Sequence, residues 1–242
     1  MIEVQHLAKR FGKVQALGDV SFRAGDGRVT GLLGPNGAGK STTLRILYTA
    51  IRADSGTAIV DGHDCAREPL AVRRGLGVLP HSTGLYPNLT ARENIRYYGE
   101  LHGLSGQRLA RSIDLLLDRL DLKEIAERRA HGFSQGQRIK VALARALVHS
   151  PRNIILDEPT NGLDVMAIRT LRDLIRGLRD HGCCVLLSSH VMQEIGALCD
   201  DLVIVGHGRV LQQGSPADLL AATACANLEE AFVHLTQAGQ QL

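Results

Sequence analysis

Residues 34–41 read Gly34-Pro35-Asn36-Gly37-Ala38-Gly39-Lys40-Ser41, and this stretch decides the fold. It has the G-x-x-x-x-G-K-[ST] form of a loop whose backbone N–H groups converge on a phosphate, an approach that bulky side chains would block. The largely apolar segment 28–33 before it predicts a buried strand, and residues 42–47 after it predict a helix. The helix N-terminus adds partial positive charge to the same anion site. We therefore predict a nucleotide-binding loop between a strand and a helix.

Three side chains at the end of this loop are expected to make specific contacts. Lys40 would place its charge against the β- and γ-phosphates, and the hydroxyl of Ser41 would ligate Mg²⁺. Thr42, at the start of the predicted helix, joins the expected nucleotide contacts. A chance match to this short pattern is the alternative, but the strand before the loop and the helix after it favour a phosphate site.

The composition argues against several other classes of protein. Lys and Arg number 28 against 25 Asp and Glu, and a net charge of +3 gives no electrostatic footprint for nucleic acid. No run approaches the roughly 18 apolar residues of a membrane span, and residues 1–4 lack the pattern of a signal peptide. The five cysteines show no metal-ligand spacing, which is typical of reduced thiols. We expect a cytoplasmic chain that reaches a membrane only through a partner.

Short apolar strands alternate with helical patterns along most of the chain. This rhythm predicts a parallel sheet covered on both faces, in one compact unit. From about residue 91 to 150 the pattern is helical instead, and it reads as an inserted subdomain. The expected strands are 2–4, 20–22, 28–33, 58–62, 76–80, 153–156, 185–187 and 202–205, and the expected later helices include 139–149, 165–179 and 191–198.

Two carboxylates follow the apolar strand 153–156. Strand alternation sends Asp157 and Glu158 in opposite directions, so we expect them to have different roles. Asp157 suits the metal side of the site, and Glu158 suits a general base or an orienter of the attacking water, a role typically contributing about 10²–10⁴-fold in rate. His190 follows the strand 185–189 at the sheet edge where ligands bind. On the residues alone, His190 is either structural or a contact of the γ-phosphate.

A second helix end has the features of a phosphate site. Ser134 reads as an N-cap before the helix 139–149, and the small Gly136 permits close approach. One nucleotide needs only one such cradle. This helix end therefore either serves a nucleotide held by another copy or is an ordinary capped helix.

Taken together, these motifs resemble those of the ATP-binding subunits of ABC transporters, from residue 2 to about residue 220. Residues 34–41 match the Walker A motif of that family, and 154–158 match its Walker B strand with a catalytic glutamate. The stretch Phe133-Ser134-Gln135-Gly136-Gln137 is similar to the family signature L-S-G-G-Q, and 161–164 is similar to the D-loop. His190 stands at the switch histidine, and Phe11 stands where the family places an adenine-stacking aromatic, with core packing as its alternative.

The resemblance implies a P-loop NTPase fold: an α/β protein with a RecA-like parallel sheet core, an antiparallel β subdomain and an inserted α-helical subdomain. It divides the chain into a nucleotide-binding core (1–80 and 151–215), a helical subdomain (81–150) and a C-terminal helical tail (216–242). It also implies ATP and Mg²⁺ as cofactors, hydrolysis by Glu158 and His190, and a dimer. Each nucleotide would lie between 34–42 of one copy and Ser134, Gln135, Gly136 and Gln137 of the other.

Two positions depart from the family pattern. Gln135 replaces the first glycine of the signature, a change that leaves Ser134 and Gly136 intact. His81 stands where the family carries a glutamine that contacts Mg²⁺ and water. Because a histidine nitrogen cannot offer the donor and acceptor of an amide together, a metal role for His81 is left open.

The segment 84–95 is similar to exporters with separate ATPase and permease chains, particularly the sodium-extrusion (Nat-type) ATPases. This resemblance implies a transport motor at the inner face of the cell membrane, with a multi-span permease as partner and sodium as the suggested cargo. The alternative is an ATPase that serves the assembly or maturation of a membrane complex. Five side chains near this segment either form a rim for a permease helix or pack internally: Leu85, Tyr86, Leu89, Tyr97 and Tyr98.

Overall fold

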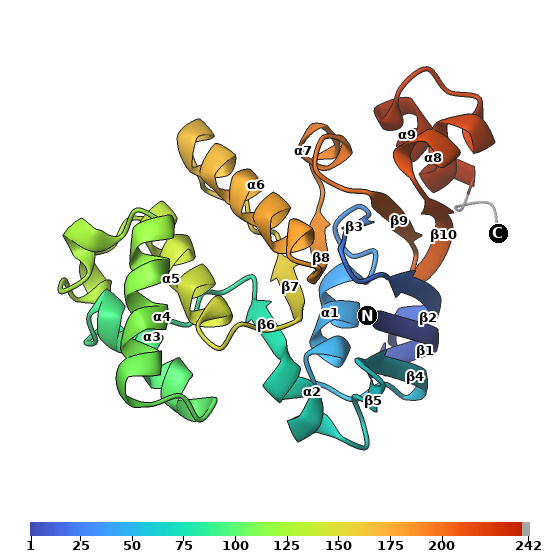
Figure 1. Cartoon of the computed structure of the whole chain (residues 1–242). Helices are drawn as coiled ribbons and strands as arrows, with labels where there is room; N and C mark the ends of the chain where they lie inside the picture. Colours follow the sequence, from blue (N-terminus) through green and yellow to red (C-terminus); the bar gives the residue numbers. More distant parts are fainter. Residues whose placement is uncertain (239–242) are drawn as a thin grey trace.

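A mixed sheet runs through the computed structural model, which describes residues 1–238, with the side chains of 193, 194 and 238 left aside. Within these residues the sheet has ten strands in the order β5-β4-β1-β2-β10-β9-β3-β8-β7-β6 (Figure 1). One half of the sheet is parallel, as the alternation of strands and helices predicts. Its strands are β9 (Asp201–Gly206), β3 (Arg28–Leu33), β8 (Cys184–Ser189), β7 (Asn153–Asp157) and β6 (Leu76–Leu79).

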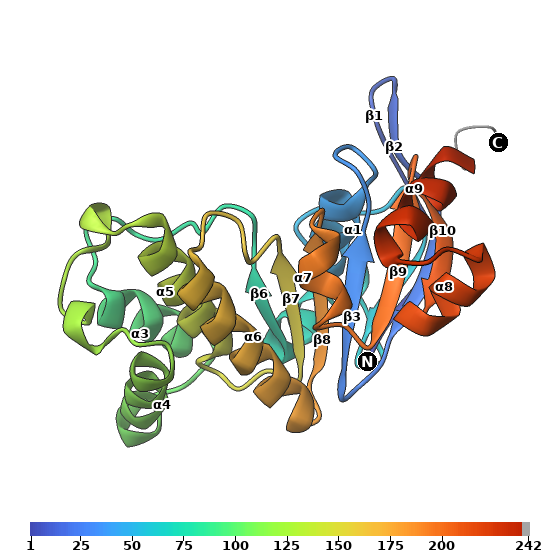
Figure 2. The same cartoon turned by 90° about the horizontal axis from the view of Figure 1, so that it is seen from above.

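The other half of the sheet is antiparallel except for the short parallel pairing of β10 with β2. Its long hairpin of β1 and β2 projects from the molecule (Figure 2) and is much longer than the short strands expected at 2–4 and 20–22. β5 and β10 were not predicted from the sequence, because β5 has only two residues and β10 lacks a continuous apolar run. The strands of this half are β1 (Ile2–Phe11), β2 (Val14–Ala24), β4 (Ser55–Val60), β5 (His63–Asp64) and β10 (Arg209–Gly214).

The two halves meet at the tight turn between β9 and β10. Gly208 lies there with φ +73°, and a Cβ at this position would lie 2.8 Å from the Ala16 carbonyl oxygen. Its N–H donates to the carbonyl of Ala38 at 3.1 Å, and its carbonyl accepts from the N–H groups of Gly18 and Asp19. β10 and β2 share a single register pair, Arg209 with Asp19. This turn therefore supports the antiparallel half and the phosphate loop together.

Three helices gather beside β6, at the end of the sheet away from the antiparallel strands (Figure 1). They are α3 (Ala91–Leu101), α4 (Gly106–Arg119) and α5 (Gln135–Leu147), with short 3₁₀ turns at 123–125 and 130–132. These helices confirm the helical pattern between 91 and 150. α5 begins four residues earlier than the expected 139, because Ser134 caps it directly.

The remaining helices pack around the sheet and at its C-terminal side. They are α1 (Lys40–Leu47), α2 (Pro69–Gly75), α6 (Val165–Asp180), α7 (Met192–Gly196), α8 (Pro216–Thr223) and α9 (Leu228–Ala238). Residues 239–242 of the expected tail lie outside the described residues. Among the helices in residues 1–238, none has the length and apolar character needed to cross a membrane.

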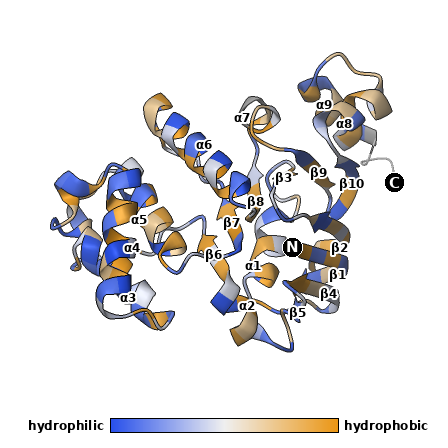
Figure 3. Ribbon diagram, viewed as in Figure 1, coloured by the Kyte–Doolittle hydropathy of each residue, from blue (hydrophilic) through white to orange (hydrophobic). Residues whose placement is uncertain are grey.

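The central strands are buried on both faces. Every residue of β7 and β8 is buried, which explains why these segments read as continuous apolar runs. Figure 3 shows apolar residues concentrated along these strands, while α3 and α4 carry many polar residues. The expected apolar face of α4 is confirmed, since Ile113, Leu116, Leu117 and Leu120 are all buried.

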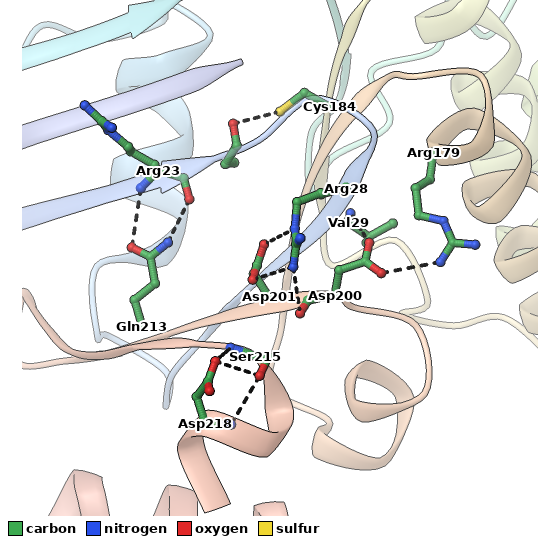
Figure 4. A network of polar contacts seen from close by, with 11 residues as sticks. Arg23, Arg28, Val29, Arg179, Cys184, Asp200, Asp201, Gln213, Ser215 and Asp218 are labelled. Carbon is green, nitrogen blue, oxygen red and sulfur yellow. Dashed lines mark hydrogen bonds and ion pairs between the residues drawn. The ribbon is translucent and has the colours of Figure 1, made fainter. Parts of the chain in front are cut away.

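A polar network anchors the start of β9 to its neighbours (Figure 4). The Arg28 guanidinium donates to both carboxylate oxygens of Asp201, a bidentate pair across β3 and β9. The Asp200 carboxylate accepts from the N–H of Val29 at 2.8 Å and from Arg179 of α6 at 3.5 Å. These contacts hold β3 at the end opposite the phosphate loop, so that the loop extends from an anchored strand.

Candidate active site

The phosphate loop lies between β3 and α1, as the sequence predicts. Its glycines are needed for different reasons. A Cβ at Gly34 would lie 2.3 Å from the Val205 carbonyl oxygen, whereas Gly37 has φ +82° with open space around it. Gly39 combines φ +106° with an approach of 2.6 Å to a methyl carbon of Leu17. The backbone is therefore folded closely against β2 and β9, and only glycine fits at these contacts.

The first turn of α1 is left open toward this loop. Gly39 is the N-cap residue, and it supplies no side-chain hydrogen bond to the N–H groups of the turn. Pro35, Asn36 and Gly37 are exposed at the rim of the loop, Ala38 is buried beneath it, and Ser41 and Thr42 are half-buried. Exposed donors at an uncapped helix end form a site for an anion.

Lys40 is buried in the same loop, with 6% of its surface exposed. Its ammonium donates to the carbonyls of Gly34 at 2.7 Å and Pro35 at 3.2 Å, and within residues 1–238 no carboxylate forms an ion pair with it. Burial lowers the pKa of Lys40, and the charges of Glu158 and Asp157 act in the opposite direction. A buried cation that contacts only carbonyl oxygens would be stabilised by a negatively charged ligand.

The oxygen atoms expected on the metal side come together. The Ser41 hydroxyl donates to Asp157 Oδ1 at 3.3 Å, and Asp157 is itself 3% exposed at the end of β7. One hydroxyl and one carboxylate fit a Mg²⁺ ion that takes its other ligands from phosphate oxygens and water. In the described part of the chain, no cluster of three or more His, Cys, Asp or Glu side chains provides a complete metal site. His81 is exposed in the segment after β6, so its metal role stays a prediction.

Glu158 and His190 lie together, at the ends of neighbouring strands. His190 Nδ1 is 3.3 Å from Glu158 Oε1, and the histidine is half exposed while the glutamate side chain is 14% exposed. Glu158 has φ +51°, a left-handed backbone that is uncommon for residues other than glycine. Its N–H donates to the carbonyl and to the hydroxyl of Ser188. The sequence predicts this pair of side chains, but not the backbone turn that brings them together.

The signature helix α5 begins with a closed capping box. Ser134 Oγ accepts from the N–H of Gln137 at 3.2 Å, and the Gln137 side chain accepts from the N–H of Ser134 at 3.1 Å. Gln135 packs against Gly162 of the D-loop, where a Cβ would lie 2.8 Å from Gln135 Cγ. At Gly136 a Cβ would meet Leu163 only at 3.6 Å, an ordinary contact. The signature is thus ordered by its own residues and by the D-loop.

Within one chain this signature lies apart from the phosphate loop. α5 packs on β6, and β6 is separated from β3 by β8 and β7 in the sheet. Three strand spacings separate β3, which leads into the phosphate loop, from β6, which contacts α5, by roughly 14 Å. A single chain therefore carries the two expected halves of a nucleotide site at different places.

Phe11 lies at the end of β1, near the tip of the projecting hairpin. Its side chain is 48% exposed, and Lys9 Nζ lies 5.5 Å from the ring centroid. This exposure excludes core packing, the alternative that the sequence leaves open. The ring is free to stack on a ligand, and its contact with adenine stays a prediction.

The five apolar side chains near 84–98 divide between the two expected environments. Tyr86 and Tyr97 are 44% and 39% exposed, with their rings edge to face at 5.3 Å. Leu85 and Tyr98 pack against the core, and Leu89 is half-buried. Only the two exposed tyrosines therefore form a rim.

Sequence reasoning missed Arg145, which holds the chain between His81 and this rim. Arg145 is 4% exposed on α5, and its guanidinium lies 4.2 Å from the centre of the Tyr98 ring. It donates to the carbonyls of Thr83 at 2.5 Å and Gly84 at 2.9 Å. An arginine within the otherwise apolar stretch 141–147 is a signal that the sequence contains. Its partners could not be found in the same way, because they lie about 60 residues earlier in the chain.

Comparisons with known proteins agree with this geometry. A family model described as "ABC transporter" matches residues 17–161. The chain is 38% identical to the ABC transporter ATP-binding protein NatA of Bacillus subtilis, with 96% of this chain and 97% of that protein covered. It is also 38% identical to a daunorubicin resistance ATP-binding protein of Streptomyces coeruleorubidus, with 99% and 75% covered.

Two solved structures are similar along almost the whole chain. One, described as an ATP-binding subunit of an ABC transporter, is 32% identical with a TM-score of 0.92, covering 98% of this chain and 99% of that chain. The other, described as a dimeric ATP-binding cassette in a post-hydrolysis state with ADP and phosphate, is 25% identical with a TM-score of 0.82, covering 89% and 98%.

Proposed function

The chain belongs to the family of ABC transporter ATP-binding proteins, and on this premise we propose that it is the ATP-hydrolysing motor subunit of an exporter. As a member of that family it is an ATPase, which converts ATP and water to ADP and phosphate. The observation that carries the proposal is the separation of the phosphate loop from the signature helix within one chain. Such an arrangement needs a second copy to complete each site.

In the proposed dimer, two copies pair head to tail around two nucleotides. Residues 34–42 of one copy bind the phosphates, and Ser134, Gln135, Gly136 and Gln137 of the other copy close over them. Phe11 stacks on the adenine from the projecting hairpin. Support comes from the similar cassette that is described as dimeric.

Each residue of the site has a distinct task in this proposal. Lys40 exchanges its carbonyl contacts for the β- and γ-phosphates. Ser41 and Asp157 would hold Mg²⁺, which would neutralise charge on the phosphate oxygens. Glu158 orients the attacking water and accepts its proton, and His190 keeps the Glu158 carboxylate in place while contacting the γ-phosphate. Loss of the γ-phosphate removes the shared ligand, and the dimer opens.

The transport partner in this proposal is a separate multi-span permease at the inner face of the cell membrane. Tyr86 and Tyr97 form the exposed rim that receives a permease helix, next to the chain segment held by Arg145. Residues 81–150 act as the helical subdomain that carries this rim, 1–80 and 151–215 act as the nucleotide-binding core, and 216–242 forms the tail. The names of the relatives, a NatA protein and a drug resistance protein, support export rather than assembly of a membrane complex. The support for sodium as cargo is the resemblance of residues 84–95 to the Nat-type ATPases.

The variant Glu158→Gln tests the proposed hydrolytic role. We expect ATP affinity within about threefold of wild type, turnover lower by about 10²–10³-fold, and an ATP-dependent dimer that persists during size-exclusion chromatography. Glu124→Gln, an exposed position on a 3₁₀ turn, is the matched control and should behave as wild type. Turnover near the wild-type rate in Glu158→Gln would refute the assignment.

The permease partner needs a separate experiment. The chain is purified from detergent-solubilised membranes, and its co-purifying proteins are identified. We expect a multi-span protein, and we expect ATPase activity to rise when the two are reconstituted in vesicles. ATP-driven accumulation of sodium in inside-out vesicles then tests sodium as the cargo. Transport of an apolar drug without transport of sodium would show that the cargo is a drug and not sodium.

A further inference from the structure

One buried hydroxyl contacts both carboxylate residues of the site. Ser188 lies on β8 in register with Asp157 of β7, and none of its surface is exposed. Its Oγ donates to Asp157 Oδ1 at 2.7 Å and accepts from the N–H of Glu158 at 3.0 Å. A hydroxyl has one proton to donate and can accept as well, so a single serine makes both bonds at once.

The bond to Glu158 supports an unfavourable backbone. Glu158 has φ +51°, and a residue held in this left-handed region costs about 1–3 kcal/mol unless its surroundings stabilise it. The only hydrogen bonds of its N–H within the described residues go to Ser188, to the hydroxyl and to the carbonyl at 3.2 Å. This turn of the backbone is what brings the Glu158 carboxylate to 3.3 Å from His190.

The bond to Asp157 acts on the other half of the site. Asp157 Oδ1 accepts from Ser188 and, at the longer distance of 3.3 Å, from Ser41 of the phosphate loop. Because Asp157 is almost fully buried, the orientation of its carboxylate depends on these donors. Ser188 thus determines how the carboxylate faces Ser41 and the expected metal.

We propose that Ser188 is a positioning residue that aligns the metal-side carboxylate of Asp157 with the hydrolytic carboxylate of Glu158. Ser188 is fully buried, and it acts through its hydrogen bonds to these two residues. The proposal rests on the proposed hydrolytic role of Glu158. A serine that merely fills the core would affect stability but not the rate of hydrolysis at saturating ATP.

The chain offers a matched control for the loss of a buried hydroxyl. Thr30, on the adjacent strand β3, is fully buried and its Oγ1 has no hydrogen-bond partner among the described residues. Thr30→Val removes this hydroxyl without removing a hydrogen bond. It therefore measures how a change in the buried part of the same sheet affects turnover. We expect its turnover to match that of the wild type.

The test measures ATP affinity and steady-state kinetics of Ser188→Ala in the full chain. We expect kcat to fall about 10–100-fold, with ATP affinity and KM within about threefold of wild type. Ser188→Cys replaces the hydroxyl by a larger thiol that is only a weak donor, so it should lose kcat in the same way. If Ser188→Ala fails to fold, Ser188→Cys carries the test alone.

A double variant separates positioning from a general structural role. In the Glu158→Gln background, adding Ser188→Ala should lower single-turnover hydrolysis of labelled ATP by a smaller factor than in the wild-type background, because only the contact with Asp157 remains to be lost. A further loss as large as in the wild-type background, or an unchanged kcat in Ser188→Ala, would overturn the proposal. Wild-type turnover in Glu158→Gln alone would instead refute the proposed function, so the two failures are distinguishable.

Discussion

The N-termini of α1 and α5 both have sequence features of a phosphate site, but they are built differently. α1 begins after Gly39, which leaves the N–H groups of the first turn without a side-chain cap. α5 begins after Ser134, whose hydroxyl and backbone are both bonded to Gln137. The first helix end is therefore open to a ligand, whereas the second is already satisfied by its own residues.

This difference indicates how the two ends share the proposed nucleotide. The open end of α1 can surround phosphates with backbone donors, and the buried Lys40 adds a full charge. At α5 the Ser134 oxygen already accepts a bond, so the hydroxyl proton is what remains to be donated. We expect α1 to supply most of the affinity, and α5 to supply a contact that completes the closed dimer.

The largest effect is expected from Lys40→Ala. Hydrogen bonds to charged groups contribute about 1.5–3 kcal/mol each, so losing contacts to two phosphates should weaken ATP binding by about a thousandfold. Equilibrium binding of a fluorescent ATP analogue measures this change. Lys123→Ala, on the exposed side chain paired with Asp118, is the control. Unchanged ATP affinity in Lys40→Ala would contradict the expectation that α1 supplies most of the affinity.

The next largest effect is expected at Gly39, and comparison with Gly136 tests how closely the backbone is packed at the two helix ends. Gly39→Ala puts a Cβ 2.6 Å from Leu17 and 2.8 Å from the Ala16 carbonyl at φ +106°, and we expect a loss of about 3 kcal/mol in the free energy of unfolding. Gly136→Ala meets nothing closer than 3.6 Å, so its stability should change by less than about 1 kcal/mol. Thermal unfolding without nucleotide compares the two variants. Equal losses in both would contradict the proposed difference in packing.

Ser134→Ala separates the cap from the ligand contact. Loss of the cap should cost about 1 kcal/mol of stability, monomer ATP affinity should stay within about twofold, and turnover should fall about tenfold or more. Ser215→Ala removes an equivalent capping box at α8 and is the matched control. It should lose similar stability with normal turnover. If both variants hydrolyse ATP normally, the α5 end has no role in the closed site.

The smallest effect is expected from Gln135→Gly. The side chain of Gln135 packs on Gly162 and makes no hydrogen bond within the described residues, so turnover should stay within about twofold of wild type. A glycine in the first turn of α5 should lower stability by about 0.5–1 kcal/mol. Steady-state ATPase assays and thermal unfolding check both values. A tenfold change in turnover would show that the D-loop contact matters for the closed site.

Local patterns explain what could be predicted from the sequence. The phosphate loop, the strand before it and the apolar face of α4 depend on residues close together in the chain, and all three are confirmed. Ser134 as a cap is confirmed for the same reason. The beginning of α1 was placed two residues too late, because the helix starts inside the loop motif itself at Lys40.

Features that depend on contacts between distant segments could not be predicted from the sequence. Ser188 meets Asp157 only because β7 and β8 pair in a particular register, and no spacing in the sequence specifies that register. The partners of Arg145 and the left-handed backbone of Glu158 depend on the same kind of contact. The exposure of Phe11 follows from the length of the β1–β2 hairpin, which short alternating patterns did not reveal.

The turn at Gly208 limits where the chain can be lengthened. Hairpin turns commonly tolerate inserted residues, and the β1–β2 turn at Gly12 has open space around it. Gly208 instead bonds to Ala38 on one side and to Gly18 and Asp19 on the other. An epitope or fluorescent protein inserted after His207 would separate the phosphate loop from its support, whereas the same insertion at Gly12 would leave the sheet intact. A label at the β1–β2 turn would spare the sheet, but it would lie next to Phe11 and its proposed adenine contact.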